Sequence, residues 1–420
     1  MTSAIKHRIA QLQQGIVPKG YKKGTIGIVP EEWRSISFST LFTSTNRYTD
    51  DLSRYPLYSL TIEDGITKKT DRYERSHLVK KENSYKVVQP NDYAYNPMNI
   101  RFGAVARHKG NMPVAVSGYY DIFNVIHESD RAFMDCFLTC DSMITYYNKV
   151  STGSLIEKQR VHFSDFMEFS IELPPIEERK EIAKILAAQD KVIELLNRKI
   201  EQLKLLKKYY LRKMFPQHGK NEPEVRFPGF AGAWEKHQLG KIFKKNVERN
   251  EGLIGFDKTI SIASMTYNRE GNGASEDSLS GYKVLRHGDV AFDGHTNKEF
   301  HYGRFVVNDL GDGIMSSRFS SLRPIDDIQI RFWKHYIHYE PIMGRLLVKA
   351  TKAGTMMNEL VVPEFLHQYL LLPSHAEQKK IGKFFDDLDA KIALLRRQHD
   401  EEVRKKKALM QLLLSGIVRV

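Results

Sequence analysis

"LPPIEERKEIAKIL" at residues 173–186 and "LPSHAEQKKIGKFF" at residues 372–385 are two copies of one pattern, and together they decide the fold. In each copy a Leu-Pro pair ends the preceding structure, and charged and apolar residues at helical spacing follow. Because the pattern recurs about half a chain later, the sequence indicates an internal duplication.

The similarity extends outward from these segments, in the same order along both halves of the chain. The aligned features are Trp33 with Trp234, "YKVVQPNDYAYN" from Tyr85 with "YKVLRHGDVAFD" from Tyr282, Gly153-Ser154 with Gly354-Thr355, and Phe166 with Phe365. Each half is therefore predicted to be one globular head followed by one helix. The central loops of the two heads agree least.

Two long helices are predicted directly after the repeated segments. From Glu177 to Phe215 no Gly or Pro occurs, and acidic residues come early and basic residues late, as the helix dipole favours. The second copy runs from Ala376 to about Leu414. Apolar residues at steps of three and four form a coiled-coil seam, namely Ile182, Leu186, Ile193, Leu196, Ile200 and Leu203, then Ile381, Phe385, Leu388, Ile392 and Leu395.

Polar residues interrupt this seam in both helices. They are Gln189 and Lys207 in the first helix and His399, Glu402 and Lys406 in the second. We predict that the two helices pack against one another as an antiparallel coiled coil, which would act as a spacer. Pairing between identical chains is the alternative that the pattern leaves open.

The segments before each helix alternate apolar and polar residues between Gly, Asn, Asp and Pro, which is typical of strands and turns. Helical patterning occurs around residues 131–147 and 329–347, so each head is predicted to be a mixed α+β domain. The expected domains are an N-terminal tail at 1–20, a first head at 21–173, a first helix at 174–216, a linker at 217–225, a second head at 226–372, and a second helix with its tail at 373–420.

The charge of the chain favours a polyanionic partner. Its 64 Lys and Arg residues against 51 Asp and Glu residues give a net charge of +13. This excess makes nucleic acid the leading candidate.

No window approaches the roughly 18 apolar residues that a membrane helix needs, so we expect a cytoplasmic protein without a membrane partner. Cys136 and Cys140 are predicted to share one face of a helix as small buried side chains.

The order of variable head, Leu-Pro segment, long helix, second variable head and second such helix resembles the specificity subunit (HsdS type) of a type I restriction-modification enzyme. The likeness covers essentially the whole chain, and the duplicated helix starts and the aligned Trp33 and Trp234 carry it. As in that family, "GIVPKG" near the N-terminus echoes "GIVRV" at residues 416–420, so the two termini are expected to meet. The stretch "MFPQHGKNEPEVRFPGF" after the first helix departs from that ending and is expected to form an irregular linker.

The resemblance implies a subunit without chemistry of its own. Each head, called a target recognition domain, would read one half of an interrupted and asymmetric site in double-stranded DNA. The helix pair would set the gap between the halves and dock two methylation subunits. S-adenosylmethionine, ATP and Mg would be bound by the methylation and restriction subunits, and this chain would bind no cofactor.

A search for catalytic motifs agrees with that division of labour. No G-x-x-x-x-G-K-[ST], H-E-x-x-H or G-x-S-x-G motif occurs. "NPMN" from Asn96 is read as a turn, and "HYIH" from His335 as a helix surface rather than a metal site. Two alternatives remain open: a fused restriction or methylation enzyme with an unrecognised catalytic site, and a basic coiled-coil adaptor without sequence specificity.

Base reading requires side chains that donate to base edges, and Lys, Ser and Thr additionally bind phosphates. Loops of the two heads supply such residues. The predicted DNA contacts are Thr67, Lys68, Lys69, Asn99, Arg101, Arg107, Ser154 and Lys158 in the first head, and Asn268, Arg269, Asn297, Lys298, Arg304, Arg318, Thr355 and Asn358 in the second.

Overall fold

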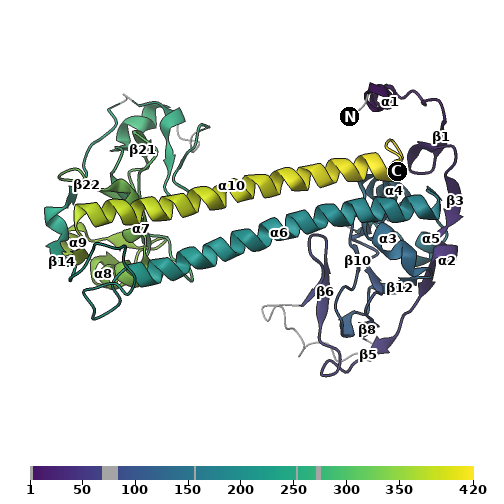
Figure 1. The fold of residues 1–420 in the computed structure, drawn as a ribbon, viewed down its shortest axis with the longest axis horizontal. Helices are drawn as coiled ribbons and strands as arrows, with labels where there is room; N and C mark the ends of the chain where they lie inside the picture. The colour runs from purple at the N-terminus through teal and green to yellow at the C-terminus, as the bar shows by residue number, and fades with distance from the viewer. Residues whose placement is uncertain (1–2, 69–83, 156–157, 252–253, 271–275) are drawn as a thin grey trace. The chain divides into compact units, whose positions relative to one another are not determined.

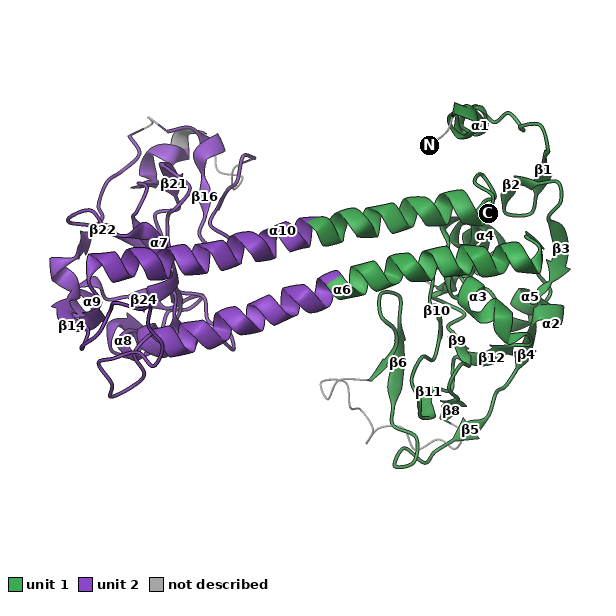
Figure 2. Ribbon diagram, viewed as in Figure 1, with its two compact units in different colours: residues 1–195, 398–420 green, residues 196–397 purple. Residues whose placement is uncertain are grey.

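A computed structural model describes residues 3–68, 84–155, 158–251, 254–270 and 276–420 (Figure 1). The chain forms two compact units, one from Met1–Leu195 with Gln398–Val420 and the other from Leu196–Arg397 (Figure 2). The boundary between the units falls inside both long helices. The first unit is called unit 1 below and the second unit 2.

The two long helices form where the sequence predicts them. Helix α6 (Ile176–Met214) has 39 residues and α10 (His375–Leu414) has 40. Each starts two residues after the proline of its Leu-Pro pair, because proline cannot continue a preceding strand and suits the approach to a helix. At 1.5 Å per residue, each helix is about 60 Å long.

The first head combines small antiparallel sheets with short helices. Its main sheet has the order β10 (Val105–Arg107), β9 (Tyr93–Tyr95), β12 (Asp121–Val125), β4 (Phe42–Ser44). The other sheets are β11 (Val114–Ser117) with β8 (Tyr85–Val88) and β5 (Tyr48–Thr49), β1 (Tyr21–Gly24) with β2 (Gly27–Pro30), β3 (Arg34–Ser37) with β13 (Ser170–Leu173), and β6 (Tyr58–Thr61) with β7 (Gly65–Lys68). The helices are α1 (Ser3–Gln13), α2 (Phe38–Leu41), α3 (Arg131–Phe137), α4 (Asp141–Val150) and α5 (Phe163–Met167), with 3-10 turns η2 (Ile100–Phe102) and η3 (Glu128–Asp130).

The second head repeats this plan. Its main sheet has the order β15 (Phe243–Lys245), β22 (Ser320–Pro324), β19 (Val290–Asp293), β20 (Arg304–Val307). The other sheets are β18 (Lys283–Leu285) with β21 (Gly313–Met315), β14 (Glu235–Gln238) with β25 (Tyr369–Leu372), β16 (Ile260–Ser261) with β17 (Thr266–Tyr267), and β23 (Thr351–Lys352) with β24 (Glu359–Leu360). The helices are α7 (Ile330–Tyr336), α8 (Glu340–Ala350) and α9 (Val362–Leu366), with 3-10 turns η5 (Leu239–Lys241), η6 (Phe256–Lys258) and η7 (Glu276–Gly281).

The two main sheets match strand for strand, which confirms the duplication. A buried aspartate precedes the aligned strands β9 and β19, and it accepts a bond from a backbone N–H three residues earlier, Asp92 from Gln89 and Asp289 from Arg286. Burial raises the pKa of both carboxyl groups. The prediction of mixed heads, each followed by a long helix, is confirmed, with two short helices in each region where helical patterning occurs.

Each long helix begins inside the core of one head. In unit 1, Ile182 and Leu186 pack with an aromatic cluster around Phe166 and with the end of α10. In unit 2, Ile381 and Phe385 join the core that contains Phe365 and the end of α6. The outer parts of the predicted seam therefore bury against a head as well as against the other helix.

The middle of the seam joins helix to helix. In unit 2, a small cluster forms from Ile200, Ile392 and Leu395, with Leu196 and Leu203 half-buried beside them. Ile193 is half-buried, and Leu388 packs against the core of the second head. Because contacts at higher numbers on α6 fall at lower numbers on α10, the paired segments are antiparallel.

Four of the five residues that interrupt the apolar seam bond across it, whereas His399 lies 3.1 Å from Asp400 on its own helix. In unit 2, Lys207 donates to Asp389 at 2.7 Å, and in unit 1, Lys406 lies 2.6 Å from Asp190. These two ion pairs occupy matching positions in the repeat. Gln189 donates to Glu402 in the same way. The polar residues therefore contribute to the pairing of the helices and fix its register.

The linker after α6 repeats the chain end after α10 more closely than its sequence indicates. Val225 N donates to Lys213 O at 2.9 Å, and Val418 N donates to Leu412 O at 3.0 Å, at matching positions. The residue that follows each valine is an arginine. The linker is irregular, as predicted, but the prediction that it departs from the terminal segment is wrong at these two residues.

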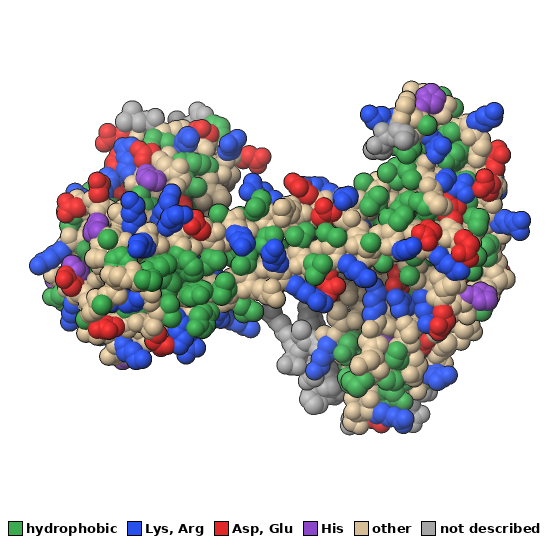
Figure 3. All heavy atoms as spheres, viewed as in Figure 1, with side chains coloured by type: hydrophobic (Ala, Val, Ile, Leu, Met, Phe, Trp, Pro, Cys, Tyr) green, Lys and Arg blue, Asp and Glu red, His purple; other side chains and the backbone are tan. Residues whose placement is uncertain are grey.

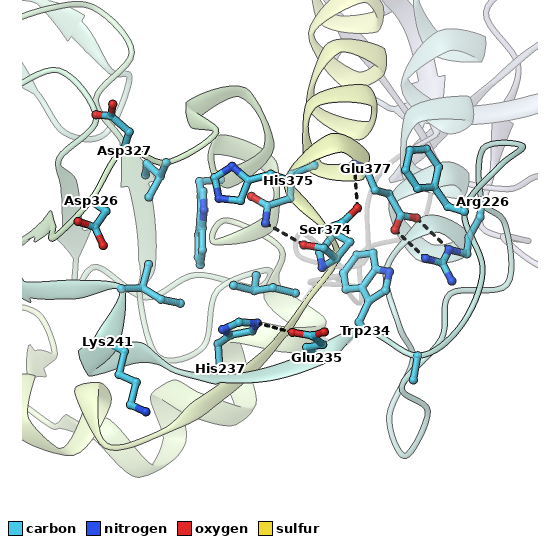
Figure 4. A pocket seen from close by; sticks show the side chains of 18 of the residues that line it. Arg226, Trp234, Glu235, His237, Lys241, Asp326, Asp327, Ser374, His375 and Glu377 are labelled. Atoms are coloured by element: carbon cyan, nitrogen blue, oxygen red, sulfur yellow. Dashed lines mark hydrogen bonds and ion pairs between the residues drawn. The ribbon is translucent and has the colours of Figure 1, made fainter.

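Both arginines hold a glutamate at the start of the other long helix. Arg226 donates from Nε and Nη2 to the two oxygens of Glu377, at 2.9 and 2.7 Å, beside a pocket of about 540 Å³ (Figure 4). Arg419 donates to Glu178 in the same manner. The termini meet as expected, since Arg8 donates to Ile417 O.

Two smaller predictions concern cysteines and membrane segments. Cys136 lies on α3, but Cys140 lies beyond its end and precedes α4, so the prediction of one shared helix face is wrong. Burial raises the pKa of both thiols to about 11. Among the described residues, no helix is long and apolar enough to cross a membrane.

Candidate nucleic-acid interface

Two loops of the second head meet at one end of its main sheet. One follows β19 and begins at Gly294, and the other lies between β23 and β24 and ends at Asn358. Asn358 N donates to Gly294 O at 2.9 Å. A Cβ added to Gly294 would lie 1.9 Å from Asn358 O, so only glycine allows this approach.

A buried carboxylate organises the side chains around these loops. Asp293 accepts bonds from the backbone N and ring Nδ1 of His295, at 3.2 and 2.7 Å. Arg304 approaches the same carboxylate at 3.4 Å and donates to Ala263 O at 2.8 Å. The ring of His295 lies beside that of Phe319, which also packs under the Arg318 guanidinium. Several donors are thereby brought to one end of the sheet.

The first head brings together the matching pair of loops with different residues. One loop follows β9 from Asn96, and the other contains the bridge between Thr152 and Arg160. Val161 N donates to Pro97 O at 3.1 Å, which joins the two loops. Asn96 Oδ1 caps the turn by accepting from Met98 N at 3.1 Å. The "NPMN" segment is thus a turn, as predicted.

The loop pairs contain most of the predicted DNA contacts. In the first head, Asn99, Ser154 and Lys158 are exposed, whereas Arg101 is buried and donates to Gln159. In the second head the exposed side chains on or beside the loop pair are Asn297, Lys298, Arg318 and Thr355, and the half-buried ones are Arg304 and Asn358.

The remaining predicted contacts lie elsewhere. Arg107 in β10 donates to both oxygens of Asp135, at 2.9 and 2.7 Å, and to Asn91. Thr67 and Lys68 lie in β7 of a hairpin. Asn268 and the exposed Arg269 follow β17 at the edge of the second head. Lys69 lies outside the described residues. Base contact by each of these residues remains a prediction.

Two histidines differ from their sequence interpretation. His335 is not on a helix surface, because its side chain is only 5% exposed and its Nε2 lies 3.1 Å from Asp386. His338 Nδ1 donates to Phe305 O at 2.9 Å, and burial lowers the pKa of both rings. His295, which the sequence interpretation missed, stands exposed among the second head's loops. Its position two residues after the "VAFD" strand was the available signal.

A family profile described as type I restriction modification DNA specificity domain matches residues 69–205 and 234–405. The two ranges together exceed half of the chain. The chain belongs to this family. Each match contains one head's loop pair and part of one long helix, so the family's domain is present twice.

Curated relatives come from Methanocaldococcus jannaschii. A putative type I restriction enzyme MjaX specificity subunit is 23% identical over 448 residues, which cover 96% of this chain and 97% of the relative. The type I restriction enzyme MjaVIII specificity subunit is 26% identical over 287 residues, which cover 61% of this chain and 63% of the relative.

Solved structures share the fold of this specificity-domain protein. The type I restriction-modification S subunit from M. genitalium has a TM-score of 0.53 at 15% identity, covering 91% of this chain and 96% of its own. A chain from a structural study of assembly and conformational transition of the type I R-M system also has a TM-score of 0.53, at 16% identity, covering 93% and 99%.

Proposed function

We propose that this chain is the noncatalytic specificity subunit of a type I restriction-modification complex, and that each head reads one half of a bipartite, asymmetric site in double-stranded DNA. The observation that carries the proposal is the repeated loop pair. Both heads build it at the same end of the same sheet, with different donors on it. Two loop pairs with the same backbone arrangement but different hydrogen-bond donors would read two different half-sites.

The long helices would set the gap between the half-sites and dock two methylation subunits, with restriction subunits joining the complex. S-adenosylmethionine, ATP and Mg would bind to those partners. A cytoplasmic location follows from this role, because the substrate is cellular DNA. The continuous helices support the spacer role, since 39 and 40 residues at 1.5 Å each give a length of about 60 Å, more than one turn of duplex at about 34–36 Å.

A genome-wide map of N6-methyladenine tests the proposal. The chain is expressed with its methylation subunit, and the control strain lacks only this chain. An interrupted asymmetric motif that appears only with the chain is the expected result. Methylation that is independent of the chain would contradict the proposal, and methyl transfer by the purified chain alone would identify a fused enzyme instead.

A further inference from the structure

Unit 2 carries a basic groove between its long helices and its head. The groove, a cavity of about 780 Å³, takes residues from α6, α10, the α7–α8 region and the loop after β19. Its basic side chains are Lys204, Lys207, Lys208, Arg212, Lys334 and Arg396, and its acidic ones are Glu299, Glu340 and Asp389. On the face shown in Figure 3, basic side chains also lie along the long helices among apolar and acidic ones.

Internal ion pairs neutralise only half of these cations. Lys207 bonds to Asp389, and Lys334 to Asp309, both well within ion-pair distance. Lys204 bonds to Glu201 on the same helix. The exposed side chains of Lys208, Arg212 and Arg396 form no ion pair with any residue that the structure describes. Three positive charges are therefore free of internal ion pairs, and they share the groove with the carboxylates of Glu299 and Glu340.

The groove adjoins the loops proposed to read DNA. Glu299, which lines the groove, directly follows Lys298 of the loop after β19. The next residue, Phe300, packs on the ring of His338 at a centroid distance of 4.9 Å, and His338 also lines the groove. The groove therefore borders the loop pair of the second head, where Lys298 is exposed.

The matching surface of unit 1 lacks part of this charge. Where unit 2 has Lys204, Arg212 and Lys334, the aligned residues are Val403, Gln411 and Asp135. Gln411 donates to Asp141 at 2.8 Å, and Lys407, which aligns with Lys208, lies 3.9 Å from the same carboxylate. At these aligned positions the free positive charge of unit 2 is therefore replaced in unit 1 by neutral or acidic residues, or by a lysine that lies beside a carboxylate.

We propose that this groove binds backbone phosphates of the duplex that continues from the half-site read by the second head. The inference rests on the proposed function and adds that phosphate contacts from this surface are made by unit 2 and not by unit 1. Lys204, Lys208 and Arg212 are four residues apart on α6, so they span about 12 Å. At 3.4 Å per base pair along one strand, this length matches about three or four phosphates.

Duplex DNA fits better than an acidic protein segment. The groove is continuous with side chains suited to base edges, and its free charges end in flexible Lys and Arg side chains, which suit sequence-independent phosphate contact. An acidic helix of a partner subunit is the competing occupant, and the experiment below separates the two.

The test uses the chain in complex with its methylation subunit and a duplex carrying the complete target. The triple variant Lys208→Gln, Arg212→Gln, Arg396→Gln is expected to reduce the slope of log affinity against log salt by about 2–3, because each lost phosphate contact contributes about 0.9. The methylated motif is expected to stay unchanged. The variant Arg212→Lys, Arg396→Lys, which retains charge, should keep the parental slope.

A matched control removes the same charge from α10 in unit 1, by Arg404→Gln, Lys405→Gln and Lys407→Gln. This control should leave the slope within about 1 of the parent. Equal slopes for both triple variants would overturn the proposal. So would an unchanged slope combined with weaker binding of the methylation subunit, which would assign the groove to a protein partner.

Failure of the inference and failure of the proposed function are distinguishable. If the parent complex shows no preferred motif, the proposed function fails. If the parent complex reads both half-sites and the triple variant in unit 2 retains the parental salt slope, only the groove proposal fails. A second measurement replaces backbone phosphates of the duplex by neutral methylphosphonates, first beside one half-site and then beside the other. For the parent complex, affinity is expected to fall more when the replacement lies beside the second half-site. The triple variant in unit 2 should not show this difference.

Discussion

At the start of each long helix an arginine holds a buried glutamate, yet the two sites differ in what else supports that glutamate. In unit 1, Trp33 Nε1 also donates to Glu178 at 3.4 Å, and Arg419 additionally binds Glu32. In unit 2, the aligned Trp234 has no partner for its indole N–H among the described residues, and Arg226 is the side chain that holds Glu377. Matching positions in a duplicated fold therefore carry unequal shares of stability.

The largest expected effect tests this inequality. Arg226→Ala leaves the carboxylate of Glu377 buried and unpaired, since it is only 1% exposed. Breaking such a buried pair costs about 3–5 kcal/mol. Arg419→Ala should cost clearly less, because Arg419 is 33% exposed and Trp33 still donates to Glu178. Urea unfolding followed by hydrogen exchange in each unit measures both losses.

Lysine replacements at the same two positions are the control, because they keep the charge and lose only the paired geometry. Equal destabilisation of the two units by the alanine variants would show that Trp33 contributes nothing, and would remove the difference described above.

The second prediction concerns the loop pairs. Gly294→Ala forces the two loops of the second head apart, because the new Cβ would lie 1.9 Å from Asn358 O. The first head has Pro97 at the aligned position and tolerates its side chain there. Discrimination at the second half-site should fall by about 1–3 kcal/mol, comparable to one mismatched base pair. Methylation of duplexes with single substitutions in either half-site measures it.

Gly281→Ala is the matched control in the same unit, since no atom lies within 4 Å of the position that its Cβ would take. Loss of discrimination at the first half-site in the Gly294→Ala variant would contradict the assignment of one head to one half-site.

The stability of the two units should also differ in its dependence on pH. Burial lowers the pKa of His335 and His338 in unit 2. The unfolded histidines, with pKa values of about 6.5, then bind more protons than the folded ones, so stability falls as the pH drops below about 6.5. The aligned residues of unit 1 are Cys136 and Thr139, which stay neutral there.

Hydrogen exchange of each unit between pH 7.5 and 5.5 checks this prediction, and His335→Gln should weaken the response of unit 2. A response of the same size in unit 1 would show that other groups control the acid sensitivity.

The smallest expected effect is a weak coupling energy between paired side chains, which should be similar in the two units. The cross-helix pairs Lys207 with Asp389 and Lys406 with Asp190 are partly exposed and occupy matching positions. Double-mutant cycles at both should give coupling energies of about 0.2–1 kcal/mol, as for other exposed pairs, and both should decrease with added salt. A coupling at only one pair would mean that the helix register is fixed from one unit.

The sequence predicted the long helices and the duplicated heads because their signals are periodic and local. Proline stops, charge bias at helix ends and apolar steps of three and four need no knowledge of distant contacts. The helix-joining cluster around Ile200 and Ile392 follows directly from that periodicity.

Other features depend on partners that are distant in the sequence. Arg107 is a plausible base donor in sequence, but a strand brings it to Asp135, which accepts from its Nε and Nη2, while its Nη1 donates to Asn91. His335 is buried because α7 packs on α10, where Asp386 lies. The sequence did not predict that Arg226 binds Glu377, because the linker and the chain end share only the two residues "VR".

The strand pairs that close each head have a consequence for how such proteins diversify. Strand β3 enters the first head beside β13, which leaves it, and β14 and β25 do the same for the second head. The main sheet and the loop pair of each head lie between these two hydrogen-bonded strands, so a recombination event needs only two junctions that are neighbours in space to exchange them. New target sequences can therefore arise in single genetic steps, with the helices left intact.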